Sequence, residues 1–245
     1  DDDPDIRRWM QQLTEQVLSD LAASGARLDA NGMSASDLRF ARSIDAWRDA
    51  FAEWFRHPDE DTGLVYLWGL ADARAVWGAD RAQDVRTAVL GVRNHPDYLR
   101  VVARASLQHR PPTGFVRDLV VEHSGEHRGT LDLKHGGLSP IVDLARYYGI
   151  VAGTAAVGTI DRIAAAQSSG LLSEVDARHL DEVHEFLTGL RHEHQVTQLQ
   201  QGRDAYDFLD PARLTPLTRR HLREAFRTIA HLQRGVDADL DARLR

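Results

Sequence analysis

The chain has 245 residues, no cysteine and a formal net charge of −7. The lack of cysteine excludes disulfides and thiolate metal sites, and the acidic charge argues against a general nucleic-acid-binding protein. No apolar run is long enough for a membrane-spanning helix, and no leader-like segment opens the sequence. We therefore expect a cytoplasmic protein that binds neither nucleic acid nor membrane.

The first elements predicted along the chain are helices. Apolar residues recur at helical spacing from residue 3 to residue 25, with Asp3 as a suitable N-cap and Pro4 as a suitable first helical residue. The acidic residues at this start fit a helix dipole better than a metal site. Residues 26–42 indicate a loop or a short irregular strand. A second helix is expected over 43–55, with Ser43 as its N-cap and an apolar stripe formed by Ile44, Trp47, Phe51 and Trp54 or Phe55.

The segment from Leu64 to Gly78 is the best candidate for a β-strand, with a bend at Gly69. Asp72 and Arg74 interrupt its apolar run two residues apart, so on a strand they would share one face. Two interpretations remain open. The two residues form an ion pair at a strand end, or Asp72 is a metal-binding carboxylate with a cation beside it.

After Gly78 the pattern is helical, with a break at Pro111 and Pro112. Phe115 to Val121 is apolar and fits either a helix or a strand. Further helices are expected over 82–92, 97–110, 159–170, 173–202 and 215–236, with another beginning at Ser139 and Pro140. Ser173 opens a sequence that resembles a capping box, so it is the expected cap of the helix over 173–202. This predicts a mostly helical α+β protein, with a small mixed α/β piece over residues 1–94 and a helical domain over 95–245.

The stretch LDLKHGGLSP contains a lysine and two glycines just before a helix. Gly136 and Gly137 allow backbone conformations that other residues resist, and a helix N-terminus presents free N–H groups. With Lys134 as a mobile cation, the stretch fits a phosphate-binding site, although it is not a Walker loop. A plain turn is the other interpretation.

The twelve histidines do not form a recognisable metal motif. His192 and His194 are two residues apart on a predicted helix, and such residues point to different faces. No His-Glu-x-x-His sequence is present, and serine–histidine–aspartate chemistry has no local support.

The run LDLKHGGLSPIVDLARYYGI resembles the signature of bacterial signal-transduction nucleotidyltransferases. These proteins are similar to PII-protein uridylyltransferase and often carry CBS and cyclic-nucleotide-binding domains upstream. The segments GMSASDLRFARSIDAWRDAFAEWF, LADARAVWG, LQHRPPTGFVRDLVV, TIDRI, LRHEHQ and LTRRHLREAF also resemble this family, in order and in approximate spacing. The resemblance therefore covers nearly the whole chain.

The resemblance implies a remnant of a polymerase-beta-like nucleotidyltransferase α/β domain followed by a helical substrate- or nucleotide-binding bundle. Such enzymes use carboxylates to hold Mg²⁺ or Mn²⁺ ions that clamp a nucleoside triphosphate and activate a hydroxyl nucleophile. The Gly-Ser and Asp-x-Asp motif that supplies the first two carboxylates is missing here. Asp72 matches the third carboxylate, catalytic and metal-binding, and Arg74 matches the family arginine two residues later, which implies a nucleotide-binding role for Arg74. The chain therefore resembles the rear part of a longer enzyme.

The resemblance also implies nucleotide-binding residues in the helical part. Arg191, His194 and Gln195 match a Leu-Arg-x-x-x-Gln run, and they could line a cleft with Lys134 and the glycine pair. Other side chains could join them: Arg146, Arg162 and Arg219 or His221. For each, a solvated or interhelical polar role is the alternative, because arginine also suits carboxylate partners.

Two hypotheses follow for the function. The first is a metal-dependent transfer of a nucleotidyl group to a hydroxyl of a protein or a small molecule. The implied partners are a nucleoside triphosphate, a protein substrate, upstream regulatory domains and a second copy of the chain. The second hypothesis is a non-catalytic regulatory module that senses a nucleotide or binds a partner protein.

Overall fold

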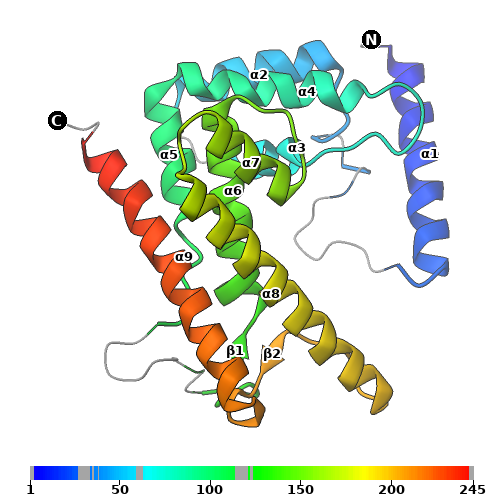
Figure 1. The fold of residues 1–245 in the computed structure, drawn as a ribbon. Helices are drawn as coiled ribbons and strands as arrows, with labels where there is room; N and C mark the ends of the chain where they lie inside the picture. Colours follow the sequence, from blue (N-terminus) through cyan, green and yellow to red (C-terminus); the bar gives the residue numbers. More distant parts are fainter. Residues whose placement is uncertain are drawn as a thin grey trace. The chain divides into compact units, whose positions relative to one another are not determined.

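The structure is a computed structural model that describes residues 3–26, 34, 36–37, 39–58, 63–113, 121 and 124–242. The chain forms two compact units, residues 1–91 and residues 92–245. The described residues are mostly helical and contain one two-stranded sheet, which confirms the mostly helical α+β class (Figure 1). No described helix combines the length and the hydropathy that crossing a bilayer requires.

The first unit contains four described helices. They are α1 (Pro4–Ala23), α2 (Ile44–Arg56), α3 (Leu64–Ala71) and α4 (Arg81–Val89), and the short 3₁₀ helix η1 (Leu90–Asn94) follows. The first two confirm the predicted helices, and their caps are as expected. The Asp3 carboxylate accepts a hydrogen bond from the Asp5 amide at 2.9 Å, and the Ser43 hydroxyl accepts one from the Ala46 amide at 3.1 Å.

The prediction of a strand over Leu64–Gly78 is wrong. Residues 64–71 form α3, and Asp72 is the residue that caps its C-terminal end. A short continuous apolar run fits a buried helix as well as a buried strand, so periodicity could not separate them. Leu67 and Ala71, one helical turn apart, are the buried residues of α3, which contacts α4.

Aromatic side chains form much of the core of the first unit. Trp47, Phe51 and Phe55 lie on one face of α2 and are buried, as the helical spacing of this segment predicted. The Arg42 guanidinium lies 5.0 Å from the centre of the Trp47 ring, at a distance typical of a cation–π contact. The described residues between 26 and 42 contain no helix or strand.

The second unit begins with α5 (Pro96–Ser106) and continues through eight further elements. They are β1 (Leu131–Asp132), the π-helical turn η2 (Lys134–Leu138), α6 (Ser139–Ala152), α7 (Thr159–Ser168), α8 (Glu174–Gln200), β2 (Phe208–Leu209), the 3₁₀ helix η3 (Pro211–Arg213) and α9 (Pro216–Ala242). The helices predicted in this part of the chain are present, and the Ser173 hydroxyl accepts a hydrogen bond from the Asp176 amide, as its predicted cap role requires. The segment 115–121 lies outside the described residues except for Val121, so its predicted structure stays open.

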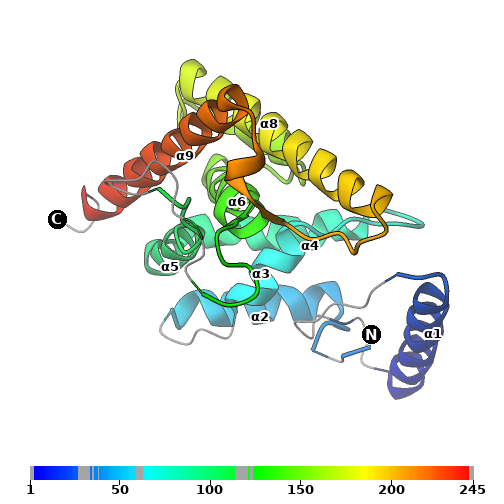
Figure 2. The ribbon, with the colours of Figure 1, turned by 90° about the horizontal axis from the view of Figure 1, so that it is seen from below.

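Helix α6 lies at the centre of the second unit. It contacts α5, α7, α9 and η2, and nine of its residues are buried, including Ile141 and Leu144. Helices α8 and α9 run alongside each other and cover this core (Figures 1 and 2). The apolar stripes of α8 and α9 supply Leu180, Leu187 and Phe226, which are fully buried.

Strands β1 and β2 bring the loop after α8 beside the segment before α6. They pair antiparallel, with Leu131 opposite Leu209 and Asp132 opposite Phe208. The Leu133 amide also donates to the Asp207 carbonyl at 3.0 Å, which extends the pairing by one bond. This small sheet places the polar connection between α8 and α9 next to residues 134–137, which we call the KHGG stretch.

Candidate functional site

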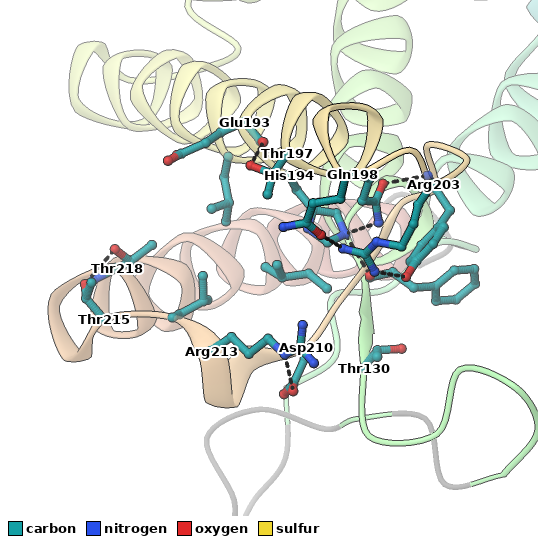
Figure 3. Close-up of a pocket in the computed structure, with 16 residues that line it drawn as sticks. Thr130, Glu193, His194, Thr197, Gln198, Arg203, Asp210, Arg213, Thr215 and Thr218 are labelled. Atoms are coloured by element: carbon teal, nitrogen blue, oxygen red, sulfur yellow. Dashed lines mark hydrogen bonds and ion pairs between the residues drawn. The ribbon is translucent and has the colours of Figure 1, made fainter.

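A cavity of about 470 Å³ lies within the second unit, between the C-terminal part of α8, β2, η3 and the start of α9. Figure 3 shows Glu193, His194, Thr197 and Gln198 on the α8 wall, with Arg213 on the opposite side. The volume is in the range of small-molecule sites, roughly 300–1,000 Å³. The full lining is Thr130, Leu190, Glu193, His194, Thr197, Gln198, Gln201, Arg203, Tyr206, Phe208, Leu209, Asp210, Arg213, Leu214, Thr215 and Thr218.

The connection between α8 and β2 is held by the Asp207 cluster, which we define as Arg191, Gln195 and Asp207. The Arg191 Nε donates to Asp207 Oδ1 at 2.6 Å, and its second guanidinium nitrogen reaches Oδ2 at 3.4 Å. The Gln195 amide donates to Asp207 Oδ1 at 2.9 Å. The predicted nucleotide-binding residues Arg191 and Gln195 are therefore both bound to a carboxylate of their own chain, and their role toward a nucleotide stays a prediction.

His194 lines the cavity and links α8 to β2. Its Nε2 lies 2.9 Å from the Phe208 carbonyl oxygen and 2.8 Å from the side-chain amide nitrogen of Gln198. The Gln198 amide oxygen accepts from the Tyr206 amide at 2.9 Å, which fixes its NH₂ group toward the ring. One ring nitrogen cannot donate and accept at once, so only one of its two contacts is a hydrogen bond in a given tautomer.

The charge on His194 is disfavoured in the folded chain. Burial is the largest cause and lowers the pKa of the imidazole below its ordinary value, and Arg203 and Arg213 lower it further. The hydrogen bond to the Phe208 carbonyl and the nearby Asp207 carboxylate act in the opposite direction. The neutral ring is therefore the form that the cavity wall favours.

Two guanidinium groups reach the cavity from different segments. Arg203 follows the end of α8 and makes contacts with Gln201 and, at 3.5 Å, with the Tyr206 hydroxyl. Arg213 is on η3, and its ion pair with Asp210 is long, at 3.4 Å, and largely exposed. Exposed pairs of this kind are weak, so both guanidinium groups can turn toward an anionic ligand at little cost.

The KHGG stretch is not an open loop before a helix. Lys134–Leu138 form the π-helical turn η2, which runs directly into α6. The Asp132 carboxylate accepts hydrogen bonds from the Lys134 and His135 amides, both at 2.9 Å. The first amides of this turn are therefore bonded to a carboxylate of the chain itself, in the place where a phosphate oxygen was expected.

The two glycines have a packing role that the sequence did not reveal. Positive backbone φ angles occur at other glycines but not at Gly136 or Gly137, so the expected special conformation is absent. A Cβ atom on Gly136 would lie 2.9 Å from Cδ of Pro112, and one on Gly137 would lie 3.3 Å from a methyl of Leu187. Glycine is needed here because the neighbouring chain approaches closely.

The other predicted nucleotide-binding cations are distributed over the second unit. Lys134 is exposed, whereas Arg146 is bound to Asp143 Oδ1 at 2.8 Å. Arg162 is buried and donates to the Ala156 carbonyl at 2.8 Å. Arg219 donates to backbone carbonyls around η3, and the His221 ring contacts Phe186, so neither lines the cavity of Figure 3.

Asp72 and Arg74 belong to the first unit, just after α3. Asp72 is partly buried, Arg74 is exposed, and both follow a helix, so the shared strand face that was expected is absent. The described residues contain no group of three or more histidine, aspartate or glutamate side chains that could hold a metal ion. The described residues therefore do not assemble the carboxylate site that Mg²⁺ or Mn²⁺ would need, and the metal-binding role of Asp72 stays a prediction.

Of the residues that line the cavity, sequence reasoning identified His194 and missed the arginines and the aromatic residues. Arg203, Tyr206 and Arg213 lie in the connection between two predicted helices, and no motif marked them. The available signal was the composition of GRDAYDFLDPAR, which combines arginines, aromatic residues and acids in a short connection. Connections of this kind often carry function because a rigid scaffold positions them.

Family comparisons agree with the resemblance found in the sequence. Residues 96–240 match a family model described as "Putative nucleotidyltransferase substrate binding domain", and residues 1–61 match one described as "Putative nucleotidyltransferase DUF294". No curated protein and no solved structure matches the chain. The cavity of Figure 3 lies wholly inside the first match. Because that match spans more than half of the chain, the chain belongs to this nucleotidyltransferase family.

Proposed function

We propose that residues 92–245 bind a nucleoside triphosphate for nucleotidyl transfer, in the cavity between α8, β2 and α9. The observation that carries the proposal is that Arg203 and Arg213, on either side of β2, line one cavity inside the substrate-binding match. Guanidinium groups bind phosphate oxygens through paired N–H donors. The aromatic rings of Tyr206 and Phe208 line the same cavity and offer a surface on which a base can stack.

The transfer itself belongs to a larger arrangement than this cavity. The proposed reaction moves a nucleotidyl group from the triphosphate to a hydroxyl of a protein or a small molecule. Mg²⁺ or Mn²⁺ would supply charge neutralisation and activate that hydroxyl, with Asp72 as one ligand and the remaining carboxylates outside this chain. Within the described residues the proposal therefore assigns binding and orientation of the substrate to the second unit.

Calorimetric titration of the chain with ATP, GTP, CTP and UTP tests the binding step. At least one nucleotide should bind, and Arg203→Ala and Arg213→Ala should each weaken its affinity about tenfold, as expected for the loss of a charge-assisted hydrogen bond of about 1.5 kcal/mol. Arg178→Ala is the matched control, because Arg178 is an exposed arginine on α8 outside the cavity lining. Unchanged affinity in both cavity variants would exclude this site.

A second experiment separates the enzyme from the non-catalytic module. In a polypeptide that also carries the Gly-Ser and Asp-x-Asp segment, Asp72→Asn should abolish Mg²⁺-dependent incorporation of labelled nucleotide while far-UV circular dichroism stays unchanged. Full incorporation by this variant would remove Asp72 from the proposal. Nucleotide binding without any incorporation by the unsubstituted polypeptide would favour a sensing module.

The same titration tests the KHGG stretch. If Lys134 and the glycine pair bind phosphate, Lys134→Ala should weaken triphosphate affinity. Because Asp132 already accepts from the amides of this turn, the alternative outcome is an affinity equal to that of the unsubstituted chain. That outcome would leave the stretch with a structural role only.

A further inference from the structure

Two histidine–aspartate pairs face each other across a second cavity of the second unit. The cavity has a volume of about 290 Å³, and its lining includes His109, after α5, and His135, on η2. The His109 Nδ1 lies 2.8 Å from Asp143 Oδ2, and the His135 Nδ1 lies 2.7 Å from Asp132 Oδ2. The centres of the two imidazole rings are 5.7 Å apart.

Both oxygens of each carboxylate already have partners within the chain, so the carboxylates orient the rings and do not bind a ligand themselves. Asp143 Oδ1 accepts from Arg146, and Asp132 Oδ1 accepts from the amides of the η2 turn. A carboxylate bound to Nδ1 fixes the tautomer in which Nδ1 carries the proton and Nε2 has a lone pair. Among the described residues, neither His109 nor His135 makes a hydrogen bond through Nε2.

The surrounding fold holds the two rings in place. The Gln233 amide, on α9, donates to the His109 carbonyl at 2.7 Å, which anchors the segment after α5. Asp143 is buried on α6, with 8% of its surface exposed. Arg110, also on the cavity wall, lies 3.6 Å from Asp237, so its charge is partly compensated. The packed core therefore anchors the segment of His109 and its carboxylate partner, while His135, whose side chain is 58% exposed, is held through its pair with Asp132.

We propose that His109 and His135 bind a divalent transition-metal ion, such as Zn²⁺, through their Nε2 atoms. Histidines that bind metals almost always donate their other ring N–H to a carboxylate or carbonyl, and both of these histidines have such a partner. With Zn–N bonds of about 2.0–2.1 Å, two imidazoles on one tetrahedral ion have ring centres about 5 Å apart. The observed separation of 5.7 Å is close to this value.

This site differs in chemistry from a magnesium site. Imidazole nitrogen suits Zn²⁺, Ni²⁺ and Co²⁺, whereas Mg²⁺ takes oxygen ligands. With two protein ligands and no third metal-binding side chain among the described residues, the remaining coordination positions are open to water or to an oxygen of a bound molecule. The inference does not depend on nucleotide binding in the cavity of Figure 3, because the two cavities share only Thr130 among their lining residues.

Metal titration of the whole chain, without an affinity tag and after chelator treatment, tests the proposal. One Zn²⁺ per chain should bind in calorimetry, and Co²⁺ should give visible absorption bands that Zn²⁺ removes. His109→Ala and His135→Ala should each lower the Zn²⁺ affinity at least tenfold, and the double variant should abolish the Co²⁺ bands. Asp132→Asn and Asp143→Asn should lower the affinity about 10- to 100-fold, as expected for residues that orient metal ligands.

His192→Ala is the matched control, because His192 is exposed on α8 and lines neither cavity. Its affinity for Zn²⁺ should equal that of the unsubstituted chain. The proposal is overturned if Zn²⁺ does not bind saturably, or if binding persists in the double histidine variant. Binding of inorganic phosphate alone, lost in the same double variant and without any Zn²⁺ binding, would instead identify an anion site and would also overturn it.

Discussion

The Asp207 cluster and the two histidine–aspartate pairs are both built from charged and polar side chains, but they differ in whether every polar atom has a partner within the chain. In the Asp207 cluster, Arg191 and Gln195 direct their donors to the two oxygens of Asp207, and the polar atoms satisfy one another. In the histidine–aspartate pairs, the carboxylates are satisfied while each imidazole keeps one nitrogen for the cavity. The first arrangement links α8 to the connection that follows it, and the second is the one that we propose as a metal site. A charged cluster therefore indicates function when some of its polar atoms are left without a partner and face a cavity.

The largest expected effect tests the structural role of the Asp207 cluster. Asp207→Ala removes the partner of Arg191 and Gln195, so the free energy of unfolding should fall by about 2–3 kcal/mol, as expected when a partly buried charged donor loses its acceptor. Urea denaturation followed by circular dichroism measures the change. Asp45→Ala, which removes an exposed pair with Arg48, should cost less than about 0.5 kcal/mol. Equal losses in the two variants would show that the cluster does not hold the scaffold.

A smaller effect tests how tightly the wall beside the histidine–aspartate pairs is packed. Gly136→Ala would place a Cβ atom 2.9 Å from Cδ of Pro112 and should lower the free energy of unfolding by about 1–2 kcal/mol. Gly189→Ala is the control, since nothing lies within 4 Å of its Cβ position on α8. This control should raise stability by up to about 1 kcal/mol because alanine favours helix more than glycine does. A tolerated Gly136→Ala would mean that the wall yields and that the two rings are less rigidly placed.

The smallest expected effect concerns pH. The folded-state pKa of His194 is lowered, mainly by burial, so on acidification the unfolded chain binds this proton first. Its contribution to stability is therefore complete above the unfolded pKa of about 6.5 and is lost as the pH falls below it. Between about pH 7.5 and about pH 5.5, the melting temperature of the unsubstituted chain should fall more than that of His194→Gln.

His184, whose pKa is also lowered by burial, remains in both proteins and accounts for part of the common decrease. Parallel melting curves for the two proteins would show that His194 is not a source of the pH dependence. They would also mean that its ring in the cavity wall accepts a proton without loss of stability.

Helix positions and their caps were predictable because they depend on local chemistry. Asp3, Ser43 and Ser173 each accept a hydrogen bond from an amide two or three residues later, so a short stretch of sequence contains the whole interaction. The segment 64–71 was mispredicted because its signal is not local. An apolar run becomes a helix or a strand according to what packs against it, and here α4 provides the contact.

The candidate sites were only partly predictable. Two glycines before a proline-initiated helix marked the KHGG stretch as a candidate binding site, and His135 and Gly136 line a cavity. Its partners His109 and Asp143 carry no motif, and they meet only because α5, α6 and η2 pack together. Arg203 and Arg213 precede and follow β2, so their positions beside one cavity depend on the path that the connection between α8 and α9 takes.

The sequence by itself determined most helices of this protein but not α3, several of their caps, and its membership in a nucleotidyltransferase family. Those properties rest on hydrogen bonds and side-chain spacings within a few residues, and on an ordered series of motifs. Only the tertiary structure decided which polar groups are consumed by the fold and which remain for a ligand. That outcome depends on atoms brought together from distant segments, such as Asp143 with His109 and Asp207 with Arg191, and no short stretch of sequence contains both members of either pair.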